Sequence, residues 1–430
     1  MATPWKLCVR KSILCAAALT LAPAVATAQG IILTGVGPVN RAMAGASTAA
    51  PIDAAGALRW NIASISGLQS SEVTFGAELL LPTEDLSSSV PGLSGSTRGE
   101  PGAGLIPEVA LVHHLANSPW TFGLGMFGIA GFKTNYPASA TNPITLPQPN
   151  GLGMLFSELE ALEVVPAISY ALTPKLSIGF APSLAIARLS LNPLFLSSPD
   201  NANGDASFTY PPGFGSRYHY GGGAQLGLYY IANESWRFGA SIKSPLWFED
   251  FRYFSQDELG QPRTERMDFD LPMIVSLGTS YSGIDRLLWA LDVRYFDYKN
   301  TNGFRDTGFG PTGAVRGLGW GNTFSVSNGL QYEVNDALTL RMGYTFQRNP
   351  ISSTNTFFNV ASPLILEHLL SVGGSMHLTE NLLFNLVYIH AFNARSSGPI
   401  HTPGIGPVPG TSVTSELSAD ALGMGFTLRY

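Results

Sequence analysis

Apolar and polar residues alternate along most of the chain from residue 72 to the C-terminus. The run that starts at Leu338 shows the pattern most clearly, because its two faces differ completely in character. One face carries Leu338, Leu340, Met342, Tyr344 and Phe346, and the other carries Thr339, Arg341, Gly343, Thr345 and Gln347. Strict alternation over this length predicts a β-strand with one apolar face. A soluble β-sandwich alternates in the same way, so the pattern alone does not identify the kind of sheet.

The alternation predicts fourteen strands, most of them of ten or more residues. They cover 72–81, 106–116, 119–131, 158–171, 174–190, 217–231, 233–244, 271–282, 286–298, 320–333, 336–348, 366–378, 380–393 and 416–430. Short polar turns such as Asn335-Asp336 alternate with long loops rich in Pro, Gly, Ser and Asn. Strands of soluble sheets average five or six residues, whereas an even number of long strands with this alternation of connections is typical of transmembrane barrels. The predicted fold is all-β: a 14-stranded antiparallel transmembrane β-barrel.

Three prolines complicate this assignment. Pro166, Pro182 and Pro272 fall inside or at the start of predicted strands, where proline removes a hydrogen-bond donor from the ladder. Either the strand ends are displaced there, or the barrel wall is locally irregular.

Composition supports a surface that partly faces lipid. Only 13% of the 430 residues are charged, and the mean hydropathy is +0.15, whereas soluble domains carry about a quarter charged residues. Lys6, Arg10 and Lys11 precede the apolar stretch 12–25 and the sequence Ala-Thr-Ala at 26–28, which predicts a signal peptide, 1–28. The alternative is a membrane-anchor helix, which needs about 20 apolar residues.

Cleavage after residue 28 would leave a chain without cysteine and with a clear negative charge. Cys8 and Cys15 both lie in the predicted signal, so no disulfide and no thiolate metal site is expected. Losing three basic residues changes 24 basic against 30 acidic residues into 21 against 30. This balance argues against a nucleic-acid partner.

The segment 29–71 does not alternate and is dominated by small residues, with helix-compatible pieces around 39–47 and 53–60. A disordered tail would be polar and highly charged, and this segment is neither. We therefore expect a plug, or hatch, inside the lumen, followed by the barrel domain over 72–430.

At this point the sequence resembles the FadL/TodX family of outer-membrane transporters of hydrophobic compounds. The likeness rests on the hatch residues Arg41-Ala42, Gly45-Ala46, Asp53-Ala54 and Asn61-Ile62-Ala63, and on the late strands around Asp292 and Asn349-Pro350. Ile62 and Ser64 depart from the family pattern, which usually has Pro and Gly there.

The resemblance implies passive uptake of hydrophobic molecules, with long-chain fatty acids as the first expectation and aromatic or aliphatic hydrocarbons as the alternative. It implies an apolar extracellular groove, a lumen pocket and a lateral opening at a kink in the third strand. It also implies a monomer in the Gram-negative outer membrane that needs no cofactor.

The candidate ligand groove is the loop after the seventh strand, because large apolar surface outside the membrane usually contacts something. Its residues are Leu246, Trp247, Phe248, Phe251, Arg252, Tyr253 and Phe254. These rings could equally pack loop against loop or join the aromatic girdle of the bilayer interface. The loop 192–216 is a second candidate.

Two further sets of residues suggest roles in the lumen and in the wall. Gly123, Gly125, Gly128 and Gly131 in the third strand could mark the kink, because glycine weakens a strand, or could make room for the hatch. Arg237, Lys243, Arg294 and Arg341 point inward by parity and could bind a carboxylate ligand, or could form structural ion pairs.

Other functions find less support. The chain has no G-x-S-x-G or H-E-x-x-H motif, and its seven histidines have no metal-ligand spacing, so an enzyme or a metal site is not expected; a Ser–His hydrolase is left open. A general porin would need no plug, and an adhesin barrel would need only the outer loops. Tyr430 at the end of the last strand is the expected signal for the barrel-insertion machinery, and lipid and lipopolysaccharide are expected to surround the barrel.

Overall fold

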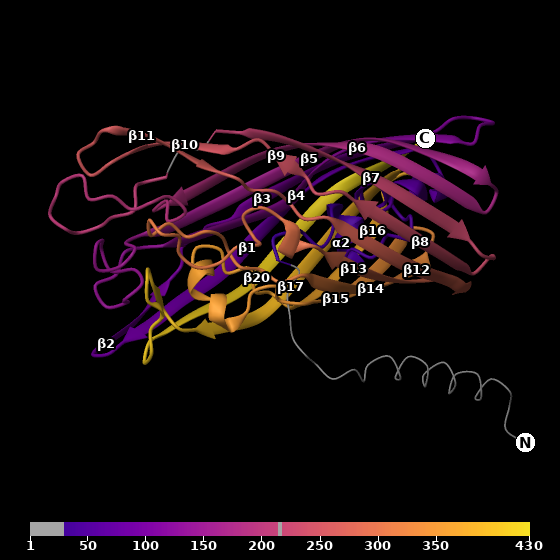
Figure 1. Cartoon of the computed structure of the whole chain (residues 1–430). Helices are drawn as coiled ribbons and strands as arrows, with labels where there is room; N and C mark the ends of the chain where they lie inside the picture. Colours follow the sequence, from indigo (N-terminus) through magenta and orange to yellow (C-terminus); the bar gives the residue numbers. More distant parts are fainter. Residues whose placement is uncertain (1–29, 214–216) are drawn as a thin grey trace, which may run out of the picture.

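The computed structural model describes residues 30–213 and 217–430 of the 430-residue chain. Fourteen antiparallel strands form a closed barrel, seen with its axis horizontal in Figure 1. The first strand, β1 (Glu72–Val90), pairs on one side with β3 (Gly104–His114) and on the other with the last strand, β20 (Ser412–Arg429). Closure pairs the backbone groups of both sheet ends, which a lipid environment requires. The predicted signal peptide and both cysteines lie outside the described residues.

The fourteen predicted strands are confirmed in number and order. The other wall strands are β4 (Trp120–Tyr136), β5 (Leu155–Thr173), β6 (Leu176–Asn192), β7 (His219–Ile231), β8 (Trp236–Lys243), β12 (Ile274–Ile284), β13 (Leu287–Phe296), β14 (Thr323–Asn335), β15 (Leu338–Gln347), β16 (His368–His377) and β17 (Leu382–Gly398). Short elements decorate the loops: β2 (Leu93–Arg98), β9 (Trp247–Phe248), β10 (Phe251–Gln256), β11 (Pro262–Met267), β18 (His401–Thr402), β19 (Gly406–Pro407), η2 (Tyr298–Asn300), η3 (Ser353–Asn355) and η4 (Phe357–Asn359).

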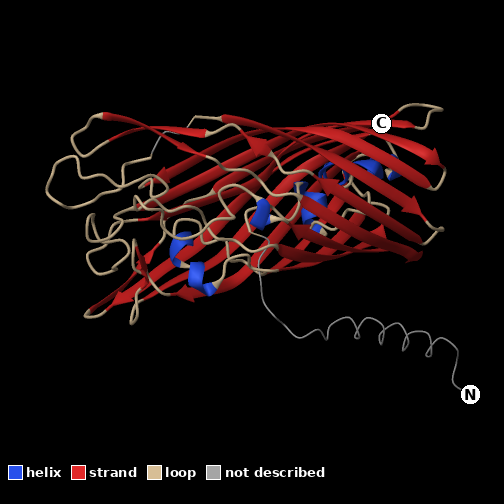
Figure 2. Ribbon diagram, viewed as in Figure 1, coloured by secondary structure: helices blue, strands red, loops and turns tan. Residues whose placement is uncertain are grey.

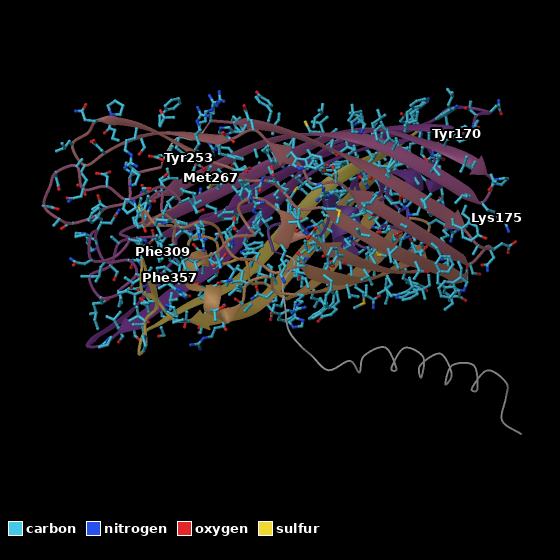
Figure 3. All side chains as sticks on the ribbon, viewed as in Figure 1. Tyr170, Lys175, Tyr253, Met267, Phe309 and Phe357 are labelled. Atoms are coloured by element: carbon cyan, nitrogen blue, oxygen red, sulfur yellow. The ribbon has the colours of Figure 1, made fainter. Side chains whose placement is uncertain are left out.

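Short polar turns close the hairpins at one end of the barrel, where Lys175 and the C-terminus lie (Figures 1 and 3). The Asn335 Oδ1 accepts hydrogen bonds from the amides of Ala337 and Leu338, both at 2.9 Å. Asn233 Oδ1 does the same for the amides of Ser235 and Trp236. Such side-chain bonds are why Asn and Asp favour tight turns. The short turns mark the periplasmic end, and the long loops mark the extracellular end.

The two faces of the wall strands differ as the alternation predicts. On β15, Leu340, Met342 and Tyr344 are 41–51% exposed, whereas Arg341 on the lumen side is 8% exposed. The outward apolar residues form the belt that faces lipid. Within the described residues, no helix combines the length and the apolar character needed to cross a bilayer.

Two of the three prolines produce a local irregularity in the wall. The β5–β6 register is the same on both sides of a gap between the pairs Val164–Leu184 and Ile168–Phe180. This register places Pro166 opposite Pro182, and neither residue has an amide proton to donate. The wall therefore tolerates the missing ladder bonds. Pro272 lies before the start of β12, so there the predicted strand began too early.

Short helices fill the lumen, as expected of a hatch (Figure 2). They are α2 (Gly37–Ala42), α3 (Ala54–Trp60) and the 3₁₀ helix η1 (Ile62–Gly67). Asn61 fixes the hatch tip: its side-chain amide donates to Thr48 O at 2.7 Å and to Leu228 O of β7 at 2.8 Å. Ile62, Ala63 and Ser64 are completely buried.

Glycines on the lumen face form a seat for the hatch tip. A Cβ atom at Gly227 would lie 2.2 Å from Asn61 Oδ1, and one at Gly239 would lie 2.0 Å from Thr48 O. No side chain fits at these distances, so the close approach of hatch and wall depends on glycine.

We expect Gly227→Ala to destabilise the folded barrel by about 1–3 kcal/mol, the usual cost of forcing a methyl group into a packed site. The measurement is the temperature at which the purified barrel loses its heat-modifiable mobility on gels. Gly222→Ala on the same strand is the matched control, because a Cβ there meets its nearest atom, Ser183 O, at an ordinary 3.5 Å. Equal thermal midpoints for the two variants would contradict the claim that the hatch tip needs glycine at position 227.

Candidate functional site

The wall is interrupted between β3 and β4. Their ladder runs from the pair His114–Thr121 to the pair Glu108–Phe127 and ends there. Beyond this point, among the wall strands, β3 continues against β1 and β4 continues against β5. The β4–β5 register also shifts between Gly128 and Ala130, which is a β-bulge. A bulge bends its strand, and here Ile129 and Ala130 are buried at 1% and 4% exposure.

The start of the hatch packs against this bend. Ile32 forms an isolated antiparallel bridge with Ala130, and the amide of Leu33 donates to Ile129 O at 3.0 Å. The backbone groups that β4 withdraws from β3 are thus partly satisfied by the hatch. Displacing residues 31–34 would break these bonds and expose the interruption in the wall.

An apolar chamber of about 120 Å³ lies between the hatch and the lumen face of the wall. Its lining comes from segments that are far apart in the sequence. They include Ile31–Leu33 of the hatch, Leu80 of β1, Phe132 of β4, Leu364 and Leu366 of the β15–β16 loop, Ile389 and Ala391 of β17, and Ala419 and Ala421 of β20. An apolar cavity of ~150 Å³ is known to hold benzene, so this chamber matches roughly one aromatic ring.

The charged groups around the chamber are bound to other partners. Arg41 forms a two-point ion pair with Glu78, and Lys133 pairs with Glu158 at 3.1 Å. Glu84 accepts from Thr134 Oγ1 and from the Asn135 amide, and Asp420 accepts from Tyr388 and His390. Among the described residues, the chamber therefore offers no unpaired cation to a ligand carboxylate.

A second apolar cavity, of about 30 Å³, lies on the extracellular side of the chamber. Its walls include Phe195 of the β6–β7 loop, Phe269 of the β11–β12 loop, and Phe304 and Trp320 of the β13–β14 loop. The rings of Phe304 and Trp320 are 4.6 Å apart and those of Phe269 and Phe304 are 5.0 Å apart. We call this space the outer cavity.

A third cavity, of about 10 Å³, lies at the wall interruption. Hatch residues Leu33 and Gly35–Pro38 face Ile106 to Glu108 of β3 and Gly128 of β4 there. Arg41 donates to Glu78 with its Nε at 2.7 Å and its Nη2 at 2.6 Å. Glu108, 5% exposed, points its Oε2 into this region without a hydrogen-bond partner among the described residues. In this state the hatch closes the interruption.

The three cavities share lining residues and form a series. The outer cavity and the chamber share Ile31, Phe132 and Leu364. The chamber and the third cavity, at the wall interruption, share Leu33 and Arg41. The series runs from beneath the extracellular loops to the side of the barrel. The resemblance implied a lumen pocket, but sequence reasoning did not identify the residues that line it, because they come from separate segments that no short pattern joins.

The predicted ligand groove divides into two faces. Leu246, Phe251 and Tyr253 are buried in the core beneath the loops, and Phe248 packs against that core. Trp247 and Phe254 are 57% and 72% exposed on the outside, and Arg252 is also exposed. Tyr253 in Figure 3 lies in the loop-bearing half of the barrel. These residues therefore do not form one continuous surface.

Asp270 connects the loop after β8 to the β13–β14 loop through two hydrogen bonds. Its carboxylate accepts from the Phe248 amide and from Asn302 Nδ2, each at 2.9 Å. Burial raises the pKa of Asp270, and the hydrogen bond from Phe248 opposes that shift. The pairing fixes the aromatic loop to the loop that carries Phe304.

The four predicted lumen cations are inward but have structural partners. Lys243 pairs with Glu163, which also binds Arg59 of the hatch at 2.7 Å. Arg294 binds Asp292 and Gly45 O and lies 3.7 Å from the centre of the Trp60 ring. The other two lie at the periplasmic end, where Arg237 donates to Ser282 and Arg341 donates to Gln331 and Ser375, beside a polar cavity of about 520 Å³. None of the four lines the chamber.

The remaining hatch residues bind the wall. Asp292 Oδ2 accepts from the amides of Ser47 and Thr48, just after Gly45. Asp53, 3% exposed, precedes α3, whose Ala54 amide donates to Glu72 at 2.6 Å. Burial raises the pKa of Asp53 to about 7, and Glu72 adds to the shift.

The four predicted kink glycines play different parts. Gly128 adjoins the bulge and Gly131 lines the chamber. A Cβ at Gly123 would lie 2.5 Å from the Leu58 side chain of the hatch, and one at Gly125 would lie 2.5 Å from the Phe127 ring. Gly123 therefore makes room for the hatch, whereas the bend itself begins at Gly128.

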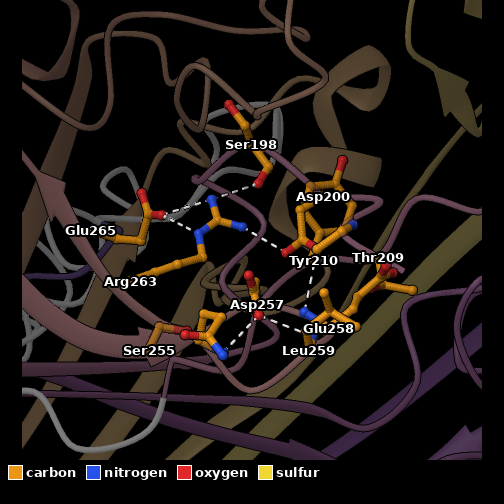
Figure 4. A network of polar contacts seen from close by, with 12 residues as sticks. Ser198, Asp200, Thr209, Tyr210, Ser255, Asp257, Glu258, Leu259, Arg263 and Glu265 are labelled. Atoms are coloured by element: carbon orange, nitrogen blue, oxygen red, sulfur yellow. Dashed lines mark hydrogen bonds and ion pairs between the residues drawn. The ribbon is translucent and has the colours of Figure 1, made fainter. Parts of the chain in front are cut away.

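Arg263 holds the extracellular loops together (Figure 4). It pairs with Asp200 at 2.7 Å and with Glu265 at 2.7 Å, and it donates to Ser198 O at 3.1 Å. The network joins Ser198 and Asp200 of the β6–β7 loop to the β10–β11 hairpin and so fixes the roof over the outer cavity.

We expect Arg263→Ala to make the loops easier to cleave while the barrel keeps its thermal midpoint. The pairs are partly exposed, so the loss should be about 1 kcal/mol and local. Limited proteolysis of the folded protein measures it. Arg305→Ala is the control, because the side chain of Arg305 pairs, among the described residues, only with its exposed neighbour Asp306 in the same loop. Cleavage no faster than in this control would contradict the bracing role.

Comparison with known proteins identifies the family of the chain. Residues 14–430 match the model of the family described as outer membrane protein transport protein (OMPP1/FadL/TodX). The chain belongs to this family. The resemblance inferred from the hatch and the late strands is thereby confirmed, and the chain is placed among outer-membrane transport proteins.

Solved structures show the same fold. The P. putida toluene transporter TodX has a TM-score of 0.67 at 18% identity, covering 93% of this chain and 99% of that one. The Ralstonia pickettii toluene transporter TbuX gives 0.66 at 19%, with the same coverage. A Pseudomonas aeruginosa FadL homologue gives 0.72 at 12%, again with 93% and 99% covered. A comparison with curated protein sequences gives no match.

Proposed function

We propose that this transporter takes up uncharged hydrophobic molecules of about the size of one aromatic ring. The observation that carries the proposal is the chamber, which is apolar, ring-sized and surrounded by charged groups that already have partners. Burying a carboxylate there without a cation would be costly, whereas an apolar ring gains about 25 cal/mol for each Å² removed from water. That TodX and TbuX are described as toluene transporters supports the same ligand class.

We infer that the ligand enters the outer cavity, passes to the chamber, and leaves sideways through the wall interruption into the bilayer when the hatch segment moves. A lateral exit suits an apolar solute, because a watery pore gives it no favourable surroundings. Long-chain fatty acids, the first expectation from the resemblance, remain the second candidate through the FadL homologue. The monomeric state and the contacts with lipopolysaccharide stay predictions.

The test is uptake of labelled toluene and labelled oleate by cells that lack their own channels of this family, with and without this protein at matched outer-membrane levels. We expect the protein to accelerate toluene uptake and to leave oleate uptake near background. Acceleration of oleate alone would overturn the ring-sized ligand and restore the fatty-acid expectation. Acceleration of neither, with a folded barrel, would contradict the transport of both classes.

A further inference from the structure

The outer cavity and the chamber meet at three residues from three different elements. Ile31 belongs to the hatch, Phe132 follows the bulge of β4, and Leu364 lies in the β15–β16 loop. We propose that these three side chains form a constriction that sets the width of the ligands admitted to the chamber, with Phe132 as the main determinant. The proposal rests on the proposed function and assigns the residues that determine its specificity.

Each side of this constriction is held by strand pairing or by hydrogen bonds. On the hatch side, the Ile32–Ala130 bridge and the Leu33–Ile129 bond hold the chain that carries Ile31. Phe132 is paired in register with Leu159 of β5. On the loop side, the Leu364 amide donates to Ser362 O at 2.8 Å, and Gln347 Nε2 donates to Leu366 O at 2.9 Å. A constriction anchored in this way keeps its width better than one formed by free loops.

Because both cavities are lined mainly by apolar side chains, they can distinguish hydrocarbon ligands only by shape. The outer cavity and the chamber are both lined mainly by apolar side chains, so a hydrocarbon finds no hydrogen bond that could tell it from another. In such a site one methylene group changes affinity by roughly 10- to 200-fold. Selection of this kind depends on how closely the walls fit the solute.

Phe132 is the residue most able to set that width. Ile31 is only 2% exposed and is held among its neighbours, whereas Phe132 and Leu364 are half-buried. The Phe132 ring is the largest of the three side chains, and its removal leaves the β4–β5 ladder intact. Widening the passage at this point need not disturb the hatch.

The experiment compares p-xylene with mesitylene, because both are uncharged arenes but mesitylene is wider. The readout is the ratio of their initial uptake rates, mesitylene over p-xylene, in cells carrying wild-type protein, Phe132→Ala or Leu364→Ala. We expect the wild type to favour p-xylene, and each variant to raise the ratio by about tenfold, the lower end of what one misfitting group costs. Phe195→Ala is the control, because Phe195 lines the outer cavity and not the chamber.

The outcomes separate the two proposals. Normal p-xylene uptake with an unchanged ratio in both folded variants would overturn the constriction and leave the proposed function standing. A wild type that transports neither arene would overturn both. An equal rise in the Phe195→Ala control would show that the outer cavity selects width, which also contradicts the assignment to Phe132. Leu364→Ala keeps the test decisive if Phe132→Ala does not fold.

Discussion

A disulfide between hatch and wall should abolish uptake by the oxidised protein and restore it on reduction. Ile32→Cys with Ala130→Cys is suited to this, because the two residues are bridge partners and such partners lie ~4.5–5.5 Å apart at Cα, within the range that a disulfide spans. Since Cys8 and Cys15 both lie in the predicted signal peptide, its removal would leave only the engineered pair. We expect at least about nine-tenths of the uptake to be lost, because only the closed state would stay populated.

The same variant serves as its own control, since reduction removes the tether but keeps both substitutions. A second control is Ser397→Cys with Thr414→Cys, which joins β17 to β20 at a pair of residues that face each other. It crosslinks wall to wall and should leave uptake unchanged. Full uptake in the oxidised hatch–wall variant would mean that the segment around Ile32 does not have to move. It would also suit a barrel whose function lies in its outer loops, such as an adhesin.

Removing Arg41 should release the hatch from the wall. Glu78 would then be buried without its partner, near Glu108, whose Oε2 has no hydrogen-bond partner among the described residues, and such a loss typically costs about 3–5 kcal/mol. We expect Arg41→Leu to increase the conductance of the barrel in planar bilayers, because an undocked hatch opens the lumen to water.

A double-mutant cycle tests whether this effect comes from the ion pair. Arg41→Leu combined with Glu78→Leu should recover most of the closed state, since replacing both partners by apolar groups is often nearly neutral. Arg188→Ala is the matched control: its pair with Glu158 is one-third exposed on the arginine side and should be worth less than about 1 kcal/mol. Equal conductance for wild type and Arg41→Leu would exclude Arg41 as a fastening point.

The barrel could be predicted from the sequence because each strand carries its own alternation of apolar and polar residues. Alternation around Leu340 and Arg341 identifies the two faces directly, and residues such as Asn335 identify the turns by their own side-chain bonds. Both signals are local, so a single sequence contains them. Pro166 and Pro182 each indicated an irregular strand. That the two prolines lie opposite each other depends on the register between β5 and β6, which a single sequence does not reveal.

The candidate site could be predicted only in part, because it depends on where distant segments meet. Aromatic density in the loop after β8 suggested one ligand groove, yet Phe251 and Tyr253 turn inward while Trp247 and Phe254 turn outward. Of the rings that line the outer cavity, Phe304 lies in a glycine-rich loop without any periodic pattern, whereas Trp320 falls at the start of the predicted strand 320–333. The alternation of each strand showed that the predicted lumen arginines point inward, but it did not show which side chains they bind.

The central claim is that the ligand passes through the apolar chamber, and filling the chamber tests this claim most directly. Ala419 faces the chamber from β20 at 7% exposure, and Ala419→Trp would occupy the space of one ring. Ala240→Trp is the control, since Ala240 shares the outward parity of Phe238 and Ile242 on β8. The measurement is toluene uptake at matched levels of folded protein. We predict background uptake for Ala419→Trp and wild-type uptake for Ala240→Trp; wild-type uptake by a folded Ala419→Trp would show that the ligand takes another path.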